Sequence, residues 1–139
     1  MLIYLAAPID YNTIDPQKWP PLREVLVDPQ KWPPLREMLV DAGMTVYSPG
    51  RAWSTKAEPI PDLQAINLEV VRRCDGLLAW LPRGVLTVGT VLELNAASEW
   101  NIPASVIGDP GWALSYLGIP AFPAADEAIN DLIRRLNDV

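Results

Sequence analysis

Residues 76–99 pair a short apolar run with a longer helical one, and this pair restricts the fold more than any other part of the chain. Gly76–Leu81 carries no charged or hydroxyl side chain, as expected of a strand that is buried on both faces. Gly89–Glu99 has the length and composition of a helix that follows such a strand. A strand buried on both faces needs helices above and below it, so the pair predicts a parallel α/β sheet.

The same alternation of strands and helices continues along the chain. One predicted helix, Asp62–Arg73, has Asp62 as its N-cap, and its apolar residues 63, 66, 70 and 71 are expected to share the inward face. The order predicts a small Rossmann-like (flavodoxin-like) doubly wound sandwich, with a parallel sheet of four to five strands, in one domain of residues 1–139. The other predicted elements are strands at Met1–Ala6, Met44–Tyr47, Ala104–Ile107 and Ala121–Phe122, and a helix at about Ala124–Asn137.

A tandem duplication of 13 residues occupies 15–40. Asp15–Val27 is repeated at once as Asp28–Val40, and the copies differ only at Val25 and Met38. Two copies do not make a solenoid. The second copy, which precedes the helix-ending turn at Gly43, is assigned as the core helix after the first strand. The first copy is either an inserted short helix or lid-like excursion, or a duplication without function.

Composition narrows the possible partners and chemistry. The net charge of −6 argues against a nucleic acid or an anionic membrane as the main partner. The single cysteine fits a reducing cytoplasm, and the absence of histidine excludes a Ser-His triad or a His-ligated metal. No targeting or membrane-spanning segment is visible. Without a G-x-G-x-x-G, a P-loop or metal-ligand spacing, we expect no cofactor.

Glu93 is the strongest candidate for a functional residue. It falls early in the predicted helix 89–99, and helical side chains tilt back toward the helix N-terminus, so its carboxylate should point at the strand-to-helix loop. In open α/β sheets this edge binds ligands. Its neighbours at three and four residues are Gly89, Thr90, Ala96 and Ala97, which make a small, weakly polar face. The alternative is an ordinary solvated glutamate on a helix surface.

Three segments in order resemble the nucleoside 2-deoxyribosyltransferase family and its relatives that hydrolyse nucleoside 5′-monophosphates. Ile3–Pro8 is similar to the first strand of the family and the loop that follows it. Asp75–Leu81 is similar to its third strand, and Gly89–Ala96 to its Gly-x-x-x-Glu-hydrophobic-Gly-x-Ala signature. The spacing between Asp75 and Glu93 also fits.

The resemblance implies an enzyme that cleaves an N-glycosidic bond. Glu93 would be the nucleophile, kept ionised by its helix N-terminus, and Tyr4 would orient it, although a strand tyrosine with a solvated hydroxyl is the alternative for Tyr4. A second base would take the sugar in a transferase, and water would take it in a hydrolase. The resemblance also implies a homodimer or higher homo-oligomer with shared sites. The residues that it places near substrate, together with the aromatic residues in neighbouring loops, are Ala7, Asp10, Tyr11, Trp53, Thr87, Gly89 and Ser115.

Some positions depart from the family pattern. Asn67 stands where the family has an aspartate that assists the departing base, and an amide cannot donate a proton as an acid does. Asn67 would therefore either select a base or be an ordinary helix-surface amide. Asn95 replaces the signature glycine and suggests a differently packed helix.

Two residues give conflicting indications about the substrate. Thr87 and Ser115 favour a 5′-monophosphate, whereas Asp10 stands where the hydrolases carry a phosphate-binding arginine and would repel phosphate. The alternative function, favoured by Asn67 and Asp10, is a non-catalytic module that binds a nucleoside or nucleotide.

Overall fold

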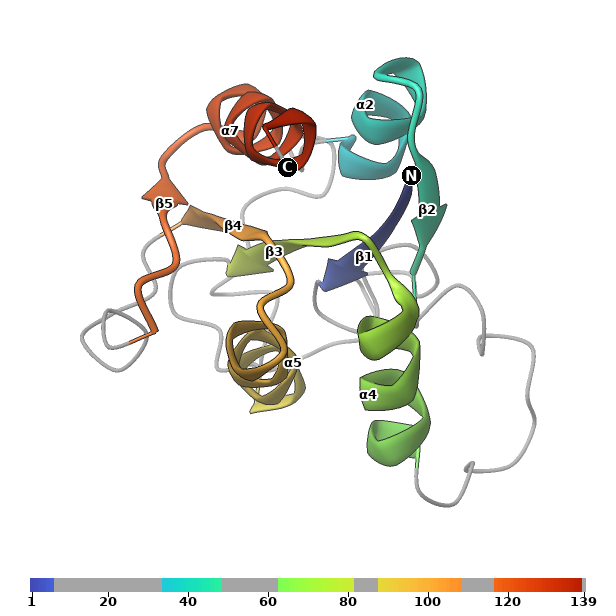
Figure 1. Ribbon diagram of the computed structural model, residues 1–139. Coiled ribbons are helices and arrows are strands. Elements are labelled where there is room, and N and C mark those ends of the chain that lie inside the picture. The colour runs from blue at the N-terminus through green and yellow to red at the C-terminus, as the bar shows by residue number, and fades with distance from the viewer. Residues whose placement is uncertain (7–33, 49–62, 82–87, 109–116, 139) are drawn as a thin grey trace, which may run out of the picture.

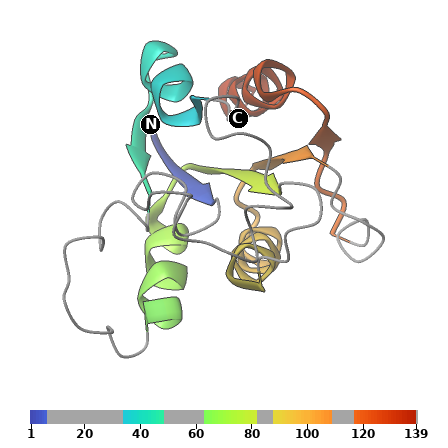
Figure 2. The ribbon, with the colours of Figure 1, turned by 180° about the vertical axis from the view of Figure 1, so that it is seen from behind.

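Five parallel strands form one sheet, in the order β2-β1-β3-β4-β5. The computed structural model describes residues 1–6, 34–48, 63–81, 88–108 and 117–138. Helices α2 (Leu35–Asp41) and α7 (Ala125–Asn137) lie on one face of the sheet, and α4 (Leu63–Arg73) and α5 (Val88–Glu99) lie on the other (Figures 1 and 2). The predicted fold class is confirmed. The strands are β1 (Leu2–Ala6), β2 (Thr45–Tyr47), β3 (Gly76–Leu81), β4 (Ala104–Gly108) and β5 (Ala121–Phe122).

The central strands are buried on both faces, as the apolar run predicted. All six residues of β3 are buried. Leu77 belongs to the apolar cluster under α4 and α5, and Leu78 belongs to the one under α2 and α7. On β1, Tyr4 likewise points toward α4 and α5, whereas Ile3 and Leu5 point the other way. Tyr4 is therefore the large polar side chain that β1 directs to the α5 side.

The second copy of the duplication supplies the helix that follows β1. Leu35 and Leu39 of α2 are fully buried, and Gly43 ends the turn after the helix with φ of +89°. This outcome confirms the assignment of the second copy as a core helix. The first copy, residues 15–27, lies outside the described residues.

The inward face of α4 differs from the prediction. Ile66 is exposed and Val70 is only half-buried, whereas Asn67 and Val71 are buried. The sequence pattern was misleading because an amide occupies a core-facing position, and apolar periodicity places such a residue outside. The predicted cap, Asp62, lies outside the described residues, as does the side chain of Leu63.

A polar network joins α7 to β4. Ser105 is fully buried and donates a hydrogen bond of 2.8 Å to Asp131 Oδ2. Arg135 donates to the same carboxylate at 2.9 Å, and also to Ser105 Oγ and the carbonyl oxygen of Ala104. Because every partner in this network is satisfied within the protein, it holds the helix on the strand and leaves no charge free.

The order of the strands defines where a ligand would bind. The connection that follows β1 leads to β2 on one side, whereas β3 lies on the other side of β1. This reversal between β1 and β3 is the topological switch point of the sheet, and ligands of open α/β sheets bind beyond the strand ends at such a point. Tyr4 lies on one of these two strands, and α5 follows the other.

Gly108 provides a test of how closely β3 and β4 must approach. Its φ is +114°, and a Cβ there would lie 2.3 Å from the carbonyl oxygen of Leu81, its partner in the sheet. Gly108→Ala should lower the free energy of unfolding in urea by about 3 kcal/mol. The control is Gly118→Ala, where φ is +67° but nothing lies within 4 Å, and about 1 kcal/mol is expected. Equal losses in the two variants would contradict the close approach.

Candidate active site

A hydrogen bond between two buried side chains, Tyr4 and Glu93, joins the first strand to α5. The Tyr4 hydroxyl donates to Glu93 Oε1 at 2.8 Å, across 89 residues of sequence. Tyr4 is fully buried, and Glu93 is only 5% exposed. The structure thus excludes both a solvated helix glutamate and a tyrosine with a solvated hydroxyl.

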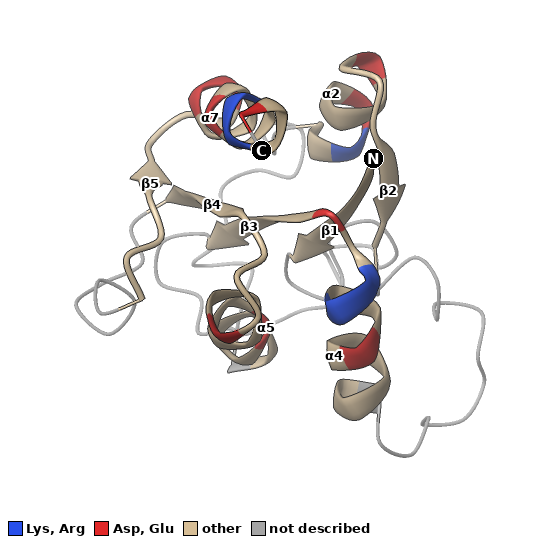
Figure 3. Ribbon diagram, in the orientation of Figure 1, with Lys and Arg blue, Asp and Glu red and all other residues tan. Residues whose placement is uncertain are grey.

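Glu93 is buried without a neutralising cation among the described residues. Arg72 and Arg73, the cations of α4, lie in its last turn, at the other edge of the sheet, and α5 carries none (Figure 3). Burial raises the pKa of Glu93 to about 7, although the hydrogen bond from Tyr4 lowers it. The expectation that the helix N-terminus keeps Glu93 fully ionised at neutral pH is therefore corrected, because the cost of removing the carboxylate from water is larger.

Tyr4 responds in the opposite sense to the same contact. Burial, followed by the charge of Glu93 and the hydrogen bond to it, raises the pKa of the Tyr4 hydroxyl well above its usual range. The hydroxyl therefore stays protonated and remains a donor at any pH in which the protein is folded. Such a donor can hold one carboxylate oxygen in place and leave the other free to react.

Two amides of α4 complete the polar cluster, and the sequence analysis missed one of them. Gln64 lies near enough to Glu93 to lower its pKa, but its Nε2 has no hydrogen-bond partner of ordinary geometry, so this contact is electrostatic. Asn67, one turn further along α4, is 5% exposed, and its Oδ1 also has no partner. Its burial excludes a helix-surface amide. The signal that could have found Gln64 is its three-residue spacing from Asn67.

The start of α5 is shaped around these groups. Thr90 is buried, and Gly89 is half-buried at the beginning of the helix. A Cβ on Gly89 would lie 3.0 Å from Gln64 Oε1, so the glycine leaves room for this amide. Asn95, in contrast, is exposed and its Nδ2 lies 3.5 Å from Glu99 Oε1. The inference that Asn95 alters the packing of the helix is therefore wrong, because that position faces solvent.

The structure thus brings together four of the predicted and newly found residues: Tyr4, Gln64, Asn67 and Glu93. Gly89 adjoins them. Cys74 is buried as predicted, and burial and the nearby Asp75 raise its pKa to about 11, so it is a poor nucleophile. The remaining predicted site residues lie outside the described residues; they are Ala7, Asp10, Tyr11, Trp53, Thr87 and Ser115.

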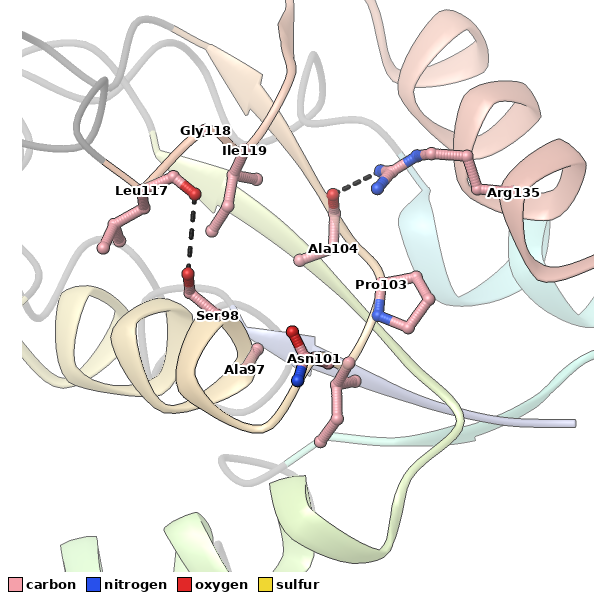
Figure 4. A pocket seen from close by; sticks show the side chains of 10 residues that line it. Ala97, Ser98, Asn101, Pro103, Ala104, Leu117, Gly118, Ile119 and Arg135 are labelled. Atoms are coloured by element: carbon pink, nitrogen blue, oxygen red, sulfur yellow. Dashed lines mark hydrogen bonds between the residues drawn. The ribbon is translucent and has the colours of Figure 1, made fainter. Parts of the chain in front are cut away.

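A separate pocket of about 260 Å³ lies near the N-terminal end of β4 and is not part of this cluster (Figure 4). Ser98, at the end of α5, donates to the carbonyl oxygen of Leu117, and Arg135 donates to that of Ala104. Its polar side chains are thus already paired within the protein. In the described part of the chain, no group of three or more Cys, Asp and Glu side chains could hold a metal ion.

Comparison with solved structures identifies the fold. A 2-deoxyribosyltransferase from the psychrotolerant bacterium Bacillus psychrosaccharolyticus is similar at a TM-score of 0.65 and 21% identity, over 94% of this chain and 91% of that chain. This chain has the deoxyribosyltransferase fold. The CMP N-glycosidase BcmB of Clostridium botulinum is similar at a TM-score of 0.57 and 16% identity, over 95% of this chain and 98% of that chain. The fold expected from the resemblance is confirmed.

A third solved structure extends the comparison. It is a conserved protein from Enterococcus faecalis V583, similar to this chain at a TM-score of 0.62 and 17% identity, over 97% of this chain and 98% of that chain. No protein-family model matches the chain, and no curated protein matches its sequence. Among the described helices, none is long and apolar enough to cross a membrane.

The buried carboxylate predicts an unusual dependence of stability on pH. Between the unfolded pKa of 4.5 and the folded value of about 7, the folded protein holds a proton on Glu93 that the unfolded chain releases. Stability contributed by this group is therefore full below pH 4.5 and is lost as pH rises through 7. Glu93→Gln removes the loss, so at pH 8 the variant should be more stable than the parent by up to about 3 kcal/mol.

The measurement is urea unfolding of both proteins from pH 4 to pH 8. Glu99→Gln, which changes an exposed glutamate of the same helix, is the matched control and should follow the parent. A stability difference between Glu93→Gln and the parent that stays constant with pH would contradict the raised pKa.

Proposed function

We propose that this protein cleaves the N-glycosidic bond of a nucleoside or a nucleoside 5′-monophosphate, with Glu93 as the nucleophile. The observation that carries the proposal is the buried hydrogen bond of 2.8 Å between Tyr4 and Glu93. A buried carboxylate without a cation reduces stability, so its position at the ligand-binding edge of the sheet favours a chemical role. The deoxyribosyltransferase and the CMP N-glycosidase that share the fold support the same class of reaction.

The reaction follows from the chemistry of a single activated carboxylate. As the bond between C1′ and the base nitrogen lengthens, positive charge develops on the sugar ring. The ionised Glu93 stabilises this charge and then bonds to C1′, while Tyr4 holds its other oxygen. The bonding electron pair leaves with the base. A second base or water then attacks C1′ of the glycosyl ester and regenerates the carboxylate.

Transfer and hydrolysis differ only in the molecule that attacks this ester. The similar solved structures include both a transferase and an N-glycosidase, so they support the common first half of the reaction. The roles of Thr87, Asp10 and Ser115 in choosing between a nucleoside and a 5′-monophosphate remain predictions. The homodimer with shared sites and the cytoplasmic location also remain predictions.

A non-catalytic binding module is the second candidate, and Asn67 is the observation that favours it. An amide at this buried position can hydrogen-bond a base but cannot protonate it as it leaves. A pocket of this kind could hold a nucleoside without breaking its glycosidic bond.

Chromatography of reaction mixtures decides between these functions. The protein is incubated with each deoxynucleoside and each deoxynucleoside monophosphate, with and without a second free base. Release or exchange of a base is expected, and Glu93→Ala should reduce it by about 10⁴-fold or more, because the variant lacks the nucleophile. The control, Glu99→Gln, should keep the parental rate.

The outcomes have distinct meanings. A base that is released at the same rate by Glu93→Ala would show that this carboxylate is not the nucleophile. Thermal stabilisation by a nucleoside, with no product from any substrate, would favour the binding module.

The pH profile of the reaction tests the role of Tyr4. Only ionised Glu93 can attack, so kcat/KM should rise with pH and level off above about 7. Tyr4→Phe removes a hydrogen bond that lowers the pKa of Glu93, so the midpoint of the rise should move to higher pH. A lower rate with an unchanged midpoint would mean that Tyr4 does not stabilise the ionised carboxylate.

A further inference from the structure

Two buried polar atoms on α4 have no hydrogen-bond partner: Gln64 Nε2, a donor, and Asn67 Oδ1, an acceptor. Buried polar atoms in native proteins are nearly always paired, and an unpaired one reduces stability. Both atoms belong to side chains on one helix face, three residues apart. Their presence as a complementary donor and acceptor calls for an explanation.

The packing of α4 does not provide that explanation. The same inward face carries Val71, which is fully buried in the apolar cluster between the helix and the sheet. An apolar residue at position 64 or 67 would continue this cluster at no cost in unpaired atoms. The face changes from apolar to amide toward the N-terminus of α4, the end at which Gln64 approaches Glu93. The amides are therefore placed where a ligand, rather than the core, would meet them.

We propose that Gln64 and Asn67 bind the departing base by a lactam edge, in which a ring N–H stands beside a carbonyl oxygen, as in hypoxanthine or uracil. This inference rests on the proposed N-glycosidic function. Gln64 Nε2 donates to the carbonyl oxygen of the base, and Asn67 Oδ1 accepts from its ring N–H. Both unpaired atoms then gain partners.

The lack of an acid beside these amides favours the same class of base. When the C1′–N bond breaks, its electron pair stays on the base, and Glu93 forms the new bond to C1′. A lactam base leaves as an anion whose charge spreads onto the carbonyl oxygen, where the Gln64 donor becomes stronger. The anion takes its proton from water afterwards. Adenine and cytosine leave more easily after protonation of the ring, and neither amide can donate that proton.

Gly89 determines where the Gln64 side chain can lie. A Cβ at this position would lie 3.0 Å from Gln64 Oε1, so Gly89→Ala displaces the amide without removing any polar group. This variant separates the position of Gln64 from its chemistry.

Thermal unfolding without ligand is the first test. Gln64→Met and Asn67→Leu replace each amide by an apolar side chain of similar size. Each variant should raise the Tm by about 3 °C or more, because an unpaired buried group is lost. Asn95→Leu, which changes an exposed amide of α5, is the control and should leave the Tm within about 1 °C. A fall in Tm for Gln64→Met and Asn67→Leu would show that the amides have a structural role and would overturn the inference.

Calorimetric titration with free bases is the second test. The parent should bind hypoxanthine about tenfold more tightly than purine, which lacks the lactam, and uracil more tightly than 3-methyluracil, which lacks the ring N–H. Gln64→Met, Asn67→Leu and Gly89→Ala should each lose most of this preference, and Asn95→Leu should keep it. Parental preference in the first three variants, or no preference in the parent, would overturn the inference.

The two proposals can fail separately. If a base is released with dependence on Glu93 but the titrations show no lactam preference, only the inference about Gln64 and Asn67 is wrong. If the preference holds and no nucleoside is cleaved, the pair binds bases as inferred and the proposed catalysis is wrong.

Discussion

Burial of one carboxylate, held by the hydroxyl of Tyr4, is the constraint on which the site depends. Glu93 comes from α5 and Tyr4 from β1, and their hydrogen bond crosses the layer between helix and sheet. The bond keeps Glu93 in place in the absence of a described cation, while burial leaves its pKa near neutrality. A carboxylate in this state is stable enough to be held and reactive enough to attack.

The rest of the structure offsets the cost of this arrangement. An unpaired buried polar group costs about 1–3 kcal/mol, and the cluster under α4 and α5 contains two such atoms beside the carboxylate. The two-sided burial of β1 and β3 supplies the apolar contacts that make these losses tolerable. The paired network of Ser105, Asp131 and Arg135 holds α7 on the opposite face without adding unpaired groups. Polar strain is thereby concentrated on one side of the sheet.

Much of the fold could be predicted, and much of the site could not. The bounds of β3 were predicted to the residue, and Glu93 and Tyr4 were identified, because an apolar strand followed by a helix leaves few architectures. Gln64 was missed, and Ile66 was placed inside, because the expected inward face of α4 followed its apolar residues. Asn95 was assigned a packing role although its position faces solvent. Each of these errors arose where a polar residue took a core-facing position or the rotation of a helix was not known.

The sequence by itself determined the alternation of strands and helices, the parallel sheet and the helix that carries Glu93, because hydrophobic periodicity is a local property. Only the tertiary structure decided that Tyr4 meets Glu93 across 89 residues and that Gln64 and Asn67 turn inward beside them. It also decided the protonation of Glu93, since a pKa depends on how much water the folded chain excludes. Contacts and burial are set by packing between distant segments, which no local pattern records.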